Sequence, residues 1–165
     1  MGKITEEEFD ELHEAGAQIP RDRAERFYDR IRGRIQSYLD RRGTAVGKTG
    51  EFLLLVPDVF ILLWRLVKDA RVSGKNKVFV GSAVAYYILP FDILPEAFLG
   101  PIGYLDDLVF GAYVLNRVLT DTDPEVLREH WPGESDVLEM IQKVLAAADS
   151  LVGSEVLGKI KRMAK

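Results

Sequence analysis

Four carboxylates stand out because they are the only charged residues in a long apolar segment. Between residues 78 and 116 every charge is negative, and the residues are Asp92, Glu96, Asp106 and Asp107. Carboxylate oxygens that converge from a loop and from a helix start form an oxygen-rich site for Mg²⁺, Ca²⁺ or Mn²⁺, or a general acid–base pair. The segment therefore predicts a candidate divalent-metal site on Asp92, Asp106 and Asp107, with hydrolysis as the reaction class to consider.

The same carboxylates also have a structural interpretation. Asp106 and Asp107 fall where a helix is expected to begin, and acids are stabilised there by backbone amides and by the helix dipole. Asp92 falls in an expected turn, where a carboxylate can accept hydrogen bonds from amides. This second arrangement is the commoner one, and the sequence leaves both open. If the acids cluster, their charge must be compensated by a divalent ion, or by amides together with a base such as Arg65 or Lys77.

A second set of polar residues lies in the preceding apolar segment. Asp58, Arg65 and Asp69 are separated by seven and four residues, which places all three near one face of a helix. They form either an internal ion-pair ladder or the solvent-facing side of that helix. Lys77 belongs to a group of bases in the turn that follows.

Composition disfavours several kinds of chemistry. The absence of cysteine excludes disulfides, thiolate metal sites and a cysteine nucleophile. His13 and His130 are far apart in the sequence, and no serine-nucleophile motif is present, so zinc or serine-triad catalysis is not indicated. Residues 43–49 end like a phosphate-binding loop, but Arg42 stands where that pattern requires a glycine. With 26 acidic and 22 basic residues, the net charge of −4 argues against nucleic-acid binding.

Helices must position these residues, because apolar side chains recur at helical spacing and no strand pattern competes. The expected helices span roughly residues 5–15, 22–42, 57–70, 75–89, 104–119, 124–131 and 135–153, followed by a short last helix. Pro90, Pro95 and Gly103 lie between two of these helices. They predict a structured loop there, and this loop would carry the first two of the four acids.

The fold class follows from length and hydrophobic content. A chain of 165 residues, of which 47% are hydrophobic, fits a single core. We predict an all-α protein: a compact helical bundle with a central hydrophobic helical hairpin formed by residues 78–89 and 104–119. Residues 1–48 are expected to form N-terminal amphipathic helices, 49–120 the core domain, and 121–165 C-terminal helices that pack on the core.

The helix expected at residues 22–42 is strongly basic, with eight arginines and four acids between Arg21 and Arg42. Such a helix either binds an anionic surface or is a solvated face with ion pairs, such as Asp22 with Arg26, and the solvated face is the commoner case. No apolar run reaches the roughly 18 residues of a simple membrane span, and the first residues lack the features of a secretion signal. We therefore expect a cytoplasmic protein, at most peripheral at the inner face of the membrane.

Short motifs in the middle of the chain share the spacing of a known family. They are Asp69-Ala70-Arg71-Val72, Lys77, Ala85-Tyr86-Tyr87-Ile88-Leu89-Pro90-Phe91-Asp92-Ile93-Leu94-Pro95-Glu96 and Gly103-Tyr104-Leu105-Asp106-Asp107. This pattern resembles the YkvA-like family of domains of unknown function, with Glu96 where aspartate is commoner and Ala70 where proline is frequent. The resemblance implies a small helical bacterial protein, or a helical segment attached to a membrane protein, with no established common activity. It also implies that any site centres on Asp92, Asp106 and Asp107.

Three functions remain as alternatives. The first is a non-enzymatic module that associates with an anionic membrane surface or a helical protein partner. The second is the divalent-metal site on Asp92, Asp106 and Asp107, and the third is an oligomerising scaffold or cargo protein that forms homo-oligomers through an apolar face. The balance is against an enzyme because no catalytic motif is present, and no cofactor is indicated apart from a divalent cation.

The structural interpretation of the acids leads to a first prediction. Asp92→Asn and Asp106→Asn are expected to lower the melting temperature, while the native protein binds no Mg²⁺, Ca²⁺ or Mn²⁺, because the carboxylates are satisfied by amides. Calorimetric titration of the native protein and both variants, with melting temperatures alongside, is the measurement. A binding heat that disappears in both variants would establish the metal site instead.

Overall fold

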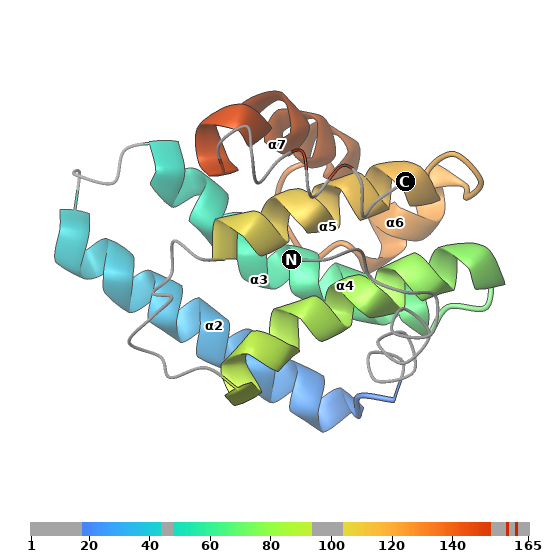
Figure 1. The fold of residues 1–165 in the computed structure, drawn as a ribbon, viewed down its shortest axis with the longest axis horizontal. Helices are drawn as coiled ribbons and strands as arrows, with labels where there is room; N and C mark the ends of the chain where they lie inside the picture. Colours follow the sequence, from blue (N-terminus) through green and yellow to red (C-terminus); the bar gives the residue numbers. More distant parts are fainter. Residues whose placement is uncertain (1–17, 44–47, 94–103, 153–157, 159–160, 162–165) are drawn as a thin grey trace.

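The protein is helical throughout the part that the computed structural model describes, which is residues 18–43, 48–93, 104–152, 158 and 161, with some side chains inside these ranges left out of the description. Its helices are α2 (Arg21–Arg42), α3 (Lys48–Val67), α4 (Gly74–Ile93), α5 (Tyr104–Val118), α6 (Pro124–His130) and α7 (Val137–Val152) (Figure 1). No strand occurs among the described residues. The predicted all-α class is confirmed.

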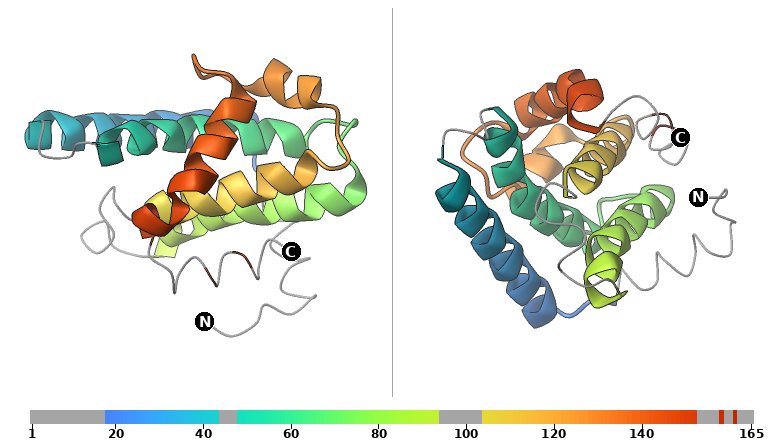
Figure 2. Two further views of the ribbon diagram at one scale, coloured as in Figure 1. Left: turned by 90° about the horizontal axis from the view of Figure 1, so that it is seen from above. Right: turned by 60° about the vertical axis from the view of Figure 1, so that its left-hand side comes forward.

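The other helices pack around α3. This helix contacts α2, α4, α5 and α6, while α5 also packs on α4 and α7. Seen from above, α2 and α3 form one layer, α4 and α5 form a second, and α7 crosses beside them (Figure 2). The helices thus form the predicted compact bundle, and α4 with α5 are the paired helices expected within it.

The apolar pattern of α3 explains its central place. Its large side chains are buried on most sides of the helix rather than along one stripe, and the fully buried ones are Leu53, Phe60, Leu62, Leu63 and Leu66. A helix that is apolar nearly all round is stable in water only when neighbours cover it on all sides. The four contacting helices provide that cover.

Helix α2 is amphipathic and packs on α3 by one stripe. Its buried residues are Ala24, Phe27, Ile31 and Ile35, which recur at spacings of three and four. The ring of Phe27 meets that of Phe60 edge to face, with centroids 4.6 Å apart. These contacts fix α2 along α3.

Two prolines lie inside helices, at positions where the sequence suggested that one helix begins and another ends. Helix α3 begins at Lys48, so Pro57 lies inside it and not at its start. Helix α4 continues through Pro90 to Ile93, beyond the expected end near residue 89. Proline removes one backbone hydrogen bond, and in α3 the apolar side chains buried on both sides of Pro57 outweigh that loss. The predicted boundaries at these prolines are wrong.

The start of α6 is as expected. Asp123 precedes the helix and accepts a hydrogen bond from the Glu125 backbone N–H at 3.0 Å, and Pro124 occupies the first helical position. Helix α7 begins at Val137, two residues after the expected start at residue 135. None of the helices in the described ranges is long and apolar enough to cross a membrane.

The packing of α2 on α3 gives a second prediction. Phe27→Ala is expected to lower the free energy of unfolding by about 3–5 kcal/mol, because it leaves a cavity against a fully buried ring. Urea denaturation measures the change. Leu54→Ala is the matched control: Leu54 is 47% exposed, so its loss is expected to cost less than about 1 kcal/mol. Equal losses for the two variants would contradict this account of the α2–α3 contact.

Candidate functional site

The predicted acidic site lies where α4 ends and α5 begins. Asp92 is in the last turn of α4, and Asp106 and Asp107 are in the first turn of α5; the two helices pack against each other. Their side chains lie outside the described residues, as do the whole of Glu96, Pro95 and Gly103. The convergence of the carboxylates therefore stays a prediction. Among the side chains that the structure describes, no three acidic or histidine groups are placed to hold a metal ion.

Neither base that was expected to compensate these acids is placed to do so. Lys77 is in the first turn of α4 and Asp92 in the last, so about 22 Å of helix separates them. Arg65 uses its Nη1 atom to donate a hydrogen bond to the carbonyl oxygen of His130, at 2.8 Å. Both bases lie toward the opposite end of α4 or α3 from Asp92, so neither is placed beside that carboxylate.

Asp58, Arg65 and Asp69 do not form a ladder. Asp58 bonds to a side chain of α2, Arg65 to the end of α6, and Asp69 to its own turn and to α6. The reason is that α3 ends at Val67. The chain turns before Asp69, so the carboxylate does not continue the helical stripe.

Asp69 is the centre of a polar cluster that ties the turn after α3 to the end of α6. Its Oδ1 accepts hydrogen bonds from the backbone N–H of Arg71 at 2.8 Å and from Nε of Arg71 at 3.1 Å. Its Oδ2 accepts from Nη2 of Arg71 at 2.7 Å and lies 2.7 Å from Nε2 of His130. Nη2 of Arg71 also donates to Glu129 at 2.6 Å. We call Asp69, Arg71, Glu129 and His130 the turn cluster.

The turn cluster strongly favours an ionised Asp69. Only 9% of its side chain is exposed, yet the hydrogen bonds from Arg71 and then from His130 hold its pKa well below the usual 3.8. Asp69 in turn raises the pKa of Arg71, and Arg71 lowers the pKa of Glu129. Asp69 and Arg71 are the two charged residues of the motif Asp69-Ala70-Arg71-Val72. The motif therefore stabilises the turn after α3. Sequence reasoning missed His130 because it lies 61 residues from Asp69.

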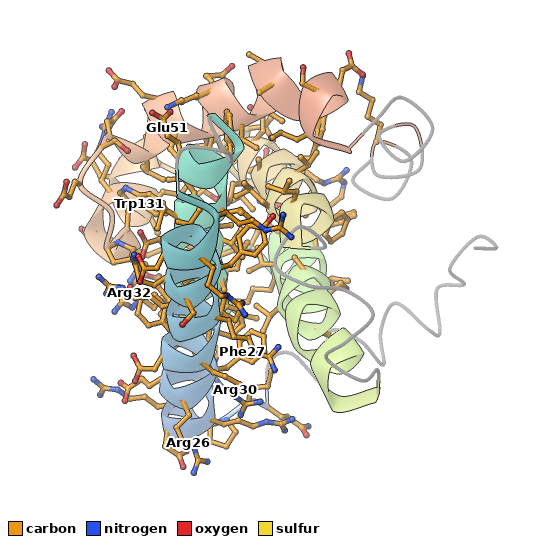
Figure 3. The ribbon with its side chains drawn as sticks, turned by 90° about the vertical axis from the view of Figure 1, so that its left-hand side faces the viewer. Arg26, Phe27, Arg30, Arg32, Glu51 and Trp131 are labelled. Carbon is orange, nitrogen blue, oxygen red and sulfur yellow. The ribbon has the colours of Figure 1, made fainter. Side chains whose placement is uncertain are left out.

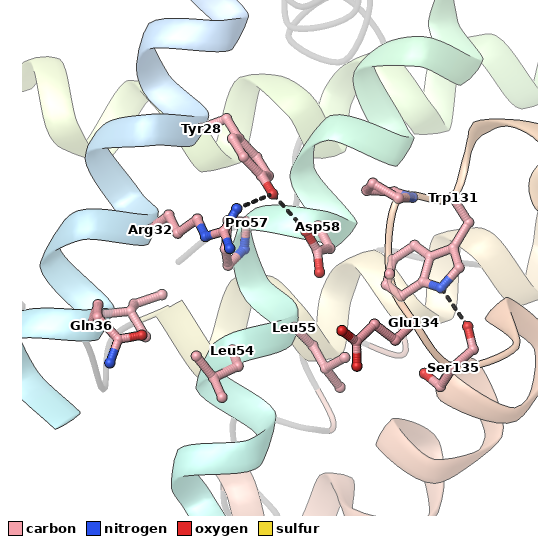
Figure 4. A pocket seen from close by; sticks show the side chains of 13 residues that line it. Tyr28, Arg32, Gln36, Leu54, Leu55, Pro57, Asp58, Trp131, Glu134 and Ser135 are labelled. Carbon is pink, nitrogen blue, oxygen red and sulfur yellow. Dashed lines mark hydrogen bonds between the residues drawn. The ribbon is translucent and has the colours of Figure 1, made fainter. Parts of the chain in front are cut away.

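A groove of about 450 Å³ lies between α2, α3 and the segment after α6 (Figure 4). We call it the Asp58 groove. It is lined chiefly by Tyr28, Arg32 and Gln36 of α2, by Leu54, Leu55, Pro57 and Asp58 of α3, and by Trp131, Gly133 and Glu134. Leu54 is the one large hydrophobic residue that is exposed in the described part of the chain. Apart from Asp58, no sequence pattern had pointed to these residues.

Asp58 carries the groove's partly buried charge. Its Oδ1 accepts a hydrogen bond from the Tyr28 hydroxyl at 2.9 Å, and Nη1 of Arg32 reaches that hydroxyl at 3.4 Å. Burial raises the pKa of Asp58, and the Tyr28 bond and the charges of Arg32 and Arg65 offset this only in part. Burial also raises the pKa of Tyr28. The phenol therefore stays protonated and donates to Asp58.

One line along α2 carries arginines and no acid. Arg23, Arg30, Arg34 and Arg41 follow one another at spacings of seven, four and seven, which places them in one line along the helix at about 100° per residue. We call them the arginine stripe. Arg30 and Arg32 project from opposite sides of α2 (Figure 3).

The acids of α2 lie away from the arginine stripe. By the same helical spacing, Asp22, Glu25, Asp29 and Asp40 share the other side of the helix. Two of them form ion pairs there, Glu25 with Arg21 at 3.0 Å and Asp22 with Arg26 at 3.3 Å. Intrahelical pairing is thus concentrated on the acidic side, as the solvated-face interpretation expected, and the stripe contains no acid.

The comparisons with known proteins concern mainly α4 and α5. A family model described as a protein of unknown function (DUF1232) matches residues 76–113. The match supports a domain family of unknown function over this part of the chain, which includes Asp92, Asp106 and Asp107.

One relative extends the comparison. The chain is 25% identical to "Uncharacterized protein ORF9" of Methanothermobacter thermautotrophicus over 87 residues, which are 53% of this chain and 60% of that protein. The chain thus spans about three fifths of the length of that relative. No solved structure matches the chain. The comparisons give no enzymatic activity.

The turn cluster gives a third prediction. Because folding lowers the pKa of Asp69, the ionised carboxylate stabilises the native state above its usual pKa of 3.8, and this stabilisation is lost as the pH falls through the lower folded value. Asp69→Asn is therefore expected to lower the free energy of unfolding by about 1–3 kcal/mol at pH 7, and by less as the pH falls below about 4. Urea denaturation across pH 2.5 to 7 measures both effects.

The control for Asp69→Asn is Glu134→Gln. Glu134 is an exposed carboxylate with no partner among the described residues, so its substitution is expected to change the free energy of unfolding by less than about 0.5 kcal/mol. A loss in Asp69→Asn that is the same at every pH would contradict the electrostatic role of the turn cluster.

Proposed function

We propose that this protein is a non-enzymatic helical module that associates peripherally with an anionic membrane surface, with the arginine stripe of α2 as the contact. The observation that carries the proposal is the arginine stripe itself, which presents four arginines in one line and no acid. The protein's net charge of −4 does not oppose this. Adsorption depends on the local charge within about a Debye length of the surface, roughly 8–10 Å.

The length of the stripe suits a surface rather than a point ligand. From Arg23 to Arg41 it spans about 27 Å of helix, and Arg23, Arg30 and Arg41 are exposed while Arg34 is half-buried. Arg23 and Arg34 also have interactions within the chain. The proposal rests on the charge that the four residues place along one line, and arginine retains that charge in such contacts.

A second basic group lies close to the start of α2. Nε1 of Trp64 donates a hydrogen bond to the carbonyl oxygen of Ile19 at 3.0 Å, which brings the end of α3 beside the residues before α2. Nζ of Lys68 lies 5.9 Å from the centre of the Trp64 ring. The bases at the end of α3 and those at the start of α2 are therefore neighbours, which extends the cationic surface.

The contact proposed here is electrostatic and reversible. No helix in the described residues can span a bilayer, and exposed large apolar side chains there are limited to Leu54. We place the protein in the cytoplasm, at the inner face of the membrane, where anionic lipids attract basic surfaces. The YkvA-like resemblance of residues 69–108 belongs to the same proposal, because it implies helical segments attached to membrane proteins.

Vesicle binding tests the proposal and is the fourth prediction. The protein is expected to float with vesicles containing phosphatidylglycerol at low salt and to be released from them at high salt. It is not expected to float with vesicles of pure phosphatidylcholine. Arg30→Gln with Arg41→Gln is expected to weaken the partition coefficient about 30-fold, since each base near the surface contributes about 1 kcal/mol.

A matched double variant tests whether binding depends on the position of the arginines or only on the net charge of the protein. Arg21→Gln with Arg26→Gln removes the same charge from the acidic side of α2, where both arginines are already paired, and is expected to weaken binding less than about threefold. Equal weakening by the two double variants, or no flotation at low salt, would refute the role of the stripe. Retention at high salt and alkaline pH would indicate insertion instead.

A further inference from the structure

We propose that the Asp58 groove binds an organic cation, namely an ammonium or guanidinium group carried on an apolar stem. The groove is a different surface from the arginine stripe, so this inference does not depend on membrane association. Three of its features fit such a group: two carboxylates with unfilled acceptor capacity, two aromatic rings, and an exposed apolar side chain beside them.

Carboxylates are the first feature. Asp58 lies between Tyr28 and Trp131 in the groove, and Glu134 lies below the Trp131 ring (Figure 4). Asp58 accepts one hydrogen bond, from Tyr28, and Glu134 has no partner in the described part of the chain. Arg32 is the single guanidinium among the lining residues, and it is directed at the Tyr28 hydroxyl. The two carboxylates therefore have oxygen atoms whose acceptor capacity no described side chain fills.

Apolar side chains of α3 form one wall of the groove. Pro57 lines the groove and lies inside α3. Leu54, one turn earlier, is 47% exposed and also lines the groove. The apolar stem of a ligand can lie along this wall.

The aromatic rings are the second feature, and one of them is held firmly. Nε1 of Trp131 donates to the carbonyl oxygen of Ser135 at 2.7 Å. A Cβ at position 133 would overlap the indole ring, so Gly133 is the residue that lets the ring take this place. Tyr28 contributes the second ring on the α2 wall. Cations are attracted to the faces of such rings, more strongly where water is excluded.

The electrostatic state of Asp58 agrees with this geometry. Burial raises its pKa despite the charges of Arg32 and Arg65, so the existing cations do not fully compensate the carboxylate. An ammonium or guanidinium group placed beside Asp58 would supply the missing charge and favour the ionised form. An anion would instead face two carboxylates, with Arg32 as the one cationic side chain among the lining residues.

The two tryptophans of the chain provide the test. Their indole N–H groups give separate signals in a ¹H–¹⁵N spectrum, with Trp131 in the groove and Trp64 bonded to Ile19 outside it. The native protein is titrated with n-hexylammonium chloride at about 0.15 M salt, which screens non-specific attraction. The Trp131 signal is expected to shift and saturate in the millimolar range, while the Trp64 signal stays in place.

Matched probes isolate the charge. Hexanol has the same stem without the charge, and hexanoate has the opposite charge; both are expected to bind more weakly than hexylammonium by about tenfold or more, the worth of one charge-assisted hydrogen bond. An equal response to hexanol would reduce the site to an apolar groove and overturn the proposal. A stronger response to hexanoate would make it an anion site on Arg32, and an unshifted Trp131 signal would also overturn it.

Two variants locate the contact. Asp58→Asn is expected to weaken hexylammonium binding about tenfold. Because this variant also alters the bond to Tyr28, Glu134→Gln is the second variant, expected to weaken binding about threefold with an unchanged melting temperature. Native affinity in both variants would refute the assignment of the carboxylates.

A lysine peptide tests whether the cation is the side chain of a partner protein or a free amine. N-acetyl-Leu-Lys-amide carries the same ammonium group on a peptide backbone. Tighter binding of the peptide than of hexylammonium would identify a lysine side chain of a partner protein as the occupant. Tighter binding of hexylammonium would identify a free amine. Both results support the site.

Discussion

The arrangement of this protein depends on the need to cover α3. Each large apolar side chain that leaves water contributes about 1.5–3 kcal/mol, and α3 has such side chains on most of its circumference. One neighbouring helix can cover only part of that surface, so α2, α4, α5 and α6 all pack on it. The backbone bond lost at Pro57 is small beside this burial. The helix therefore continues through the proline, and Pro57 lines the Asp58 groove.

The same constraint decides where the polar residues of this region lie. A charge cannot stay in the covered part of α3 without a partner. Asp58 consequently lies at the margin beside α2, where Tyr28 donates to it. Arg65 lies near the last turn, where the carbonyl of His130 accepts its hydrogen bond, and Asp69 falls in the turn beyond. The Asp58 groove and the turn cluster thus both lie outside the covered surface of α3, the first at its margin beside α2 and the second beyond its last residue.

Sequence reasoning succeeded where the signal is local. The stripe of Phe27, Ile31 and Ile35 has a helical period, and Asp123 before Pro124 is a cap whose parts are adjacent in sequence. It failed where the deciding interactions are distant, since the partners of Asp58 and Asp69 come from helices about 30 and 61 residues away, as the bonds to Tyr28 and His130 show. The helix boundaries predicted at Pro57 and Pro90 were wrong because tertiary burial overrides the low helix propensity of proline. The grouping of Asp92, Asp106 and Asp107 stays a prediction because their side chains lie outside the described residues.

Helix α2 relates the two proposed surfaces to each other. Tyr28, Arg32 and Gln36 recur every four residues, so they follow the flank of α2 that borders the groove. The arginine stripe runs along the other flank, on the far side of the buried residues. Arg30 and Arg32 point to opposite sides in Figure 3. A membrane that contacts the stripe would therefore leave the Asp58 groove facing away from the lipid. The two surfaces do not compete, and a protein held at a membrane through one flank of α2 can present the groove on the other to an organic cation.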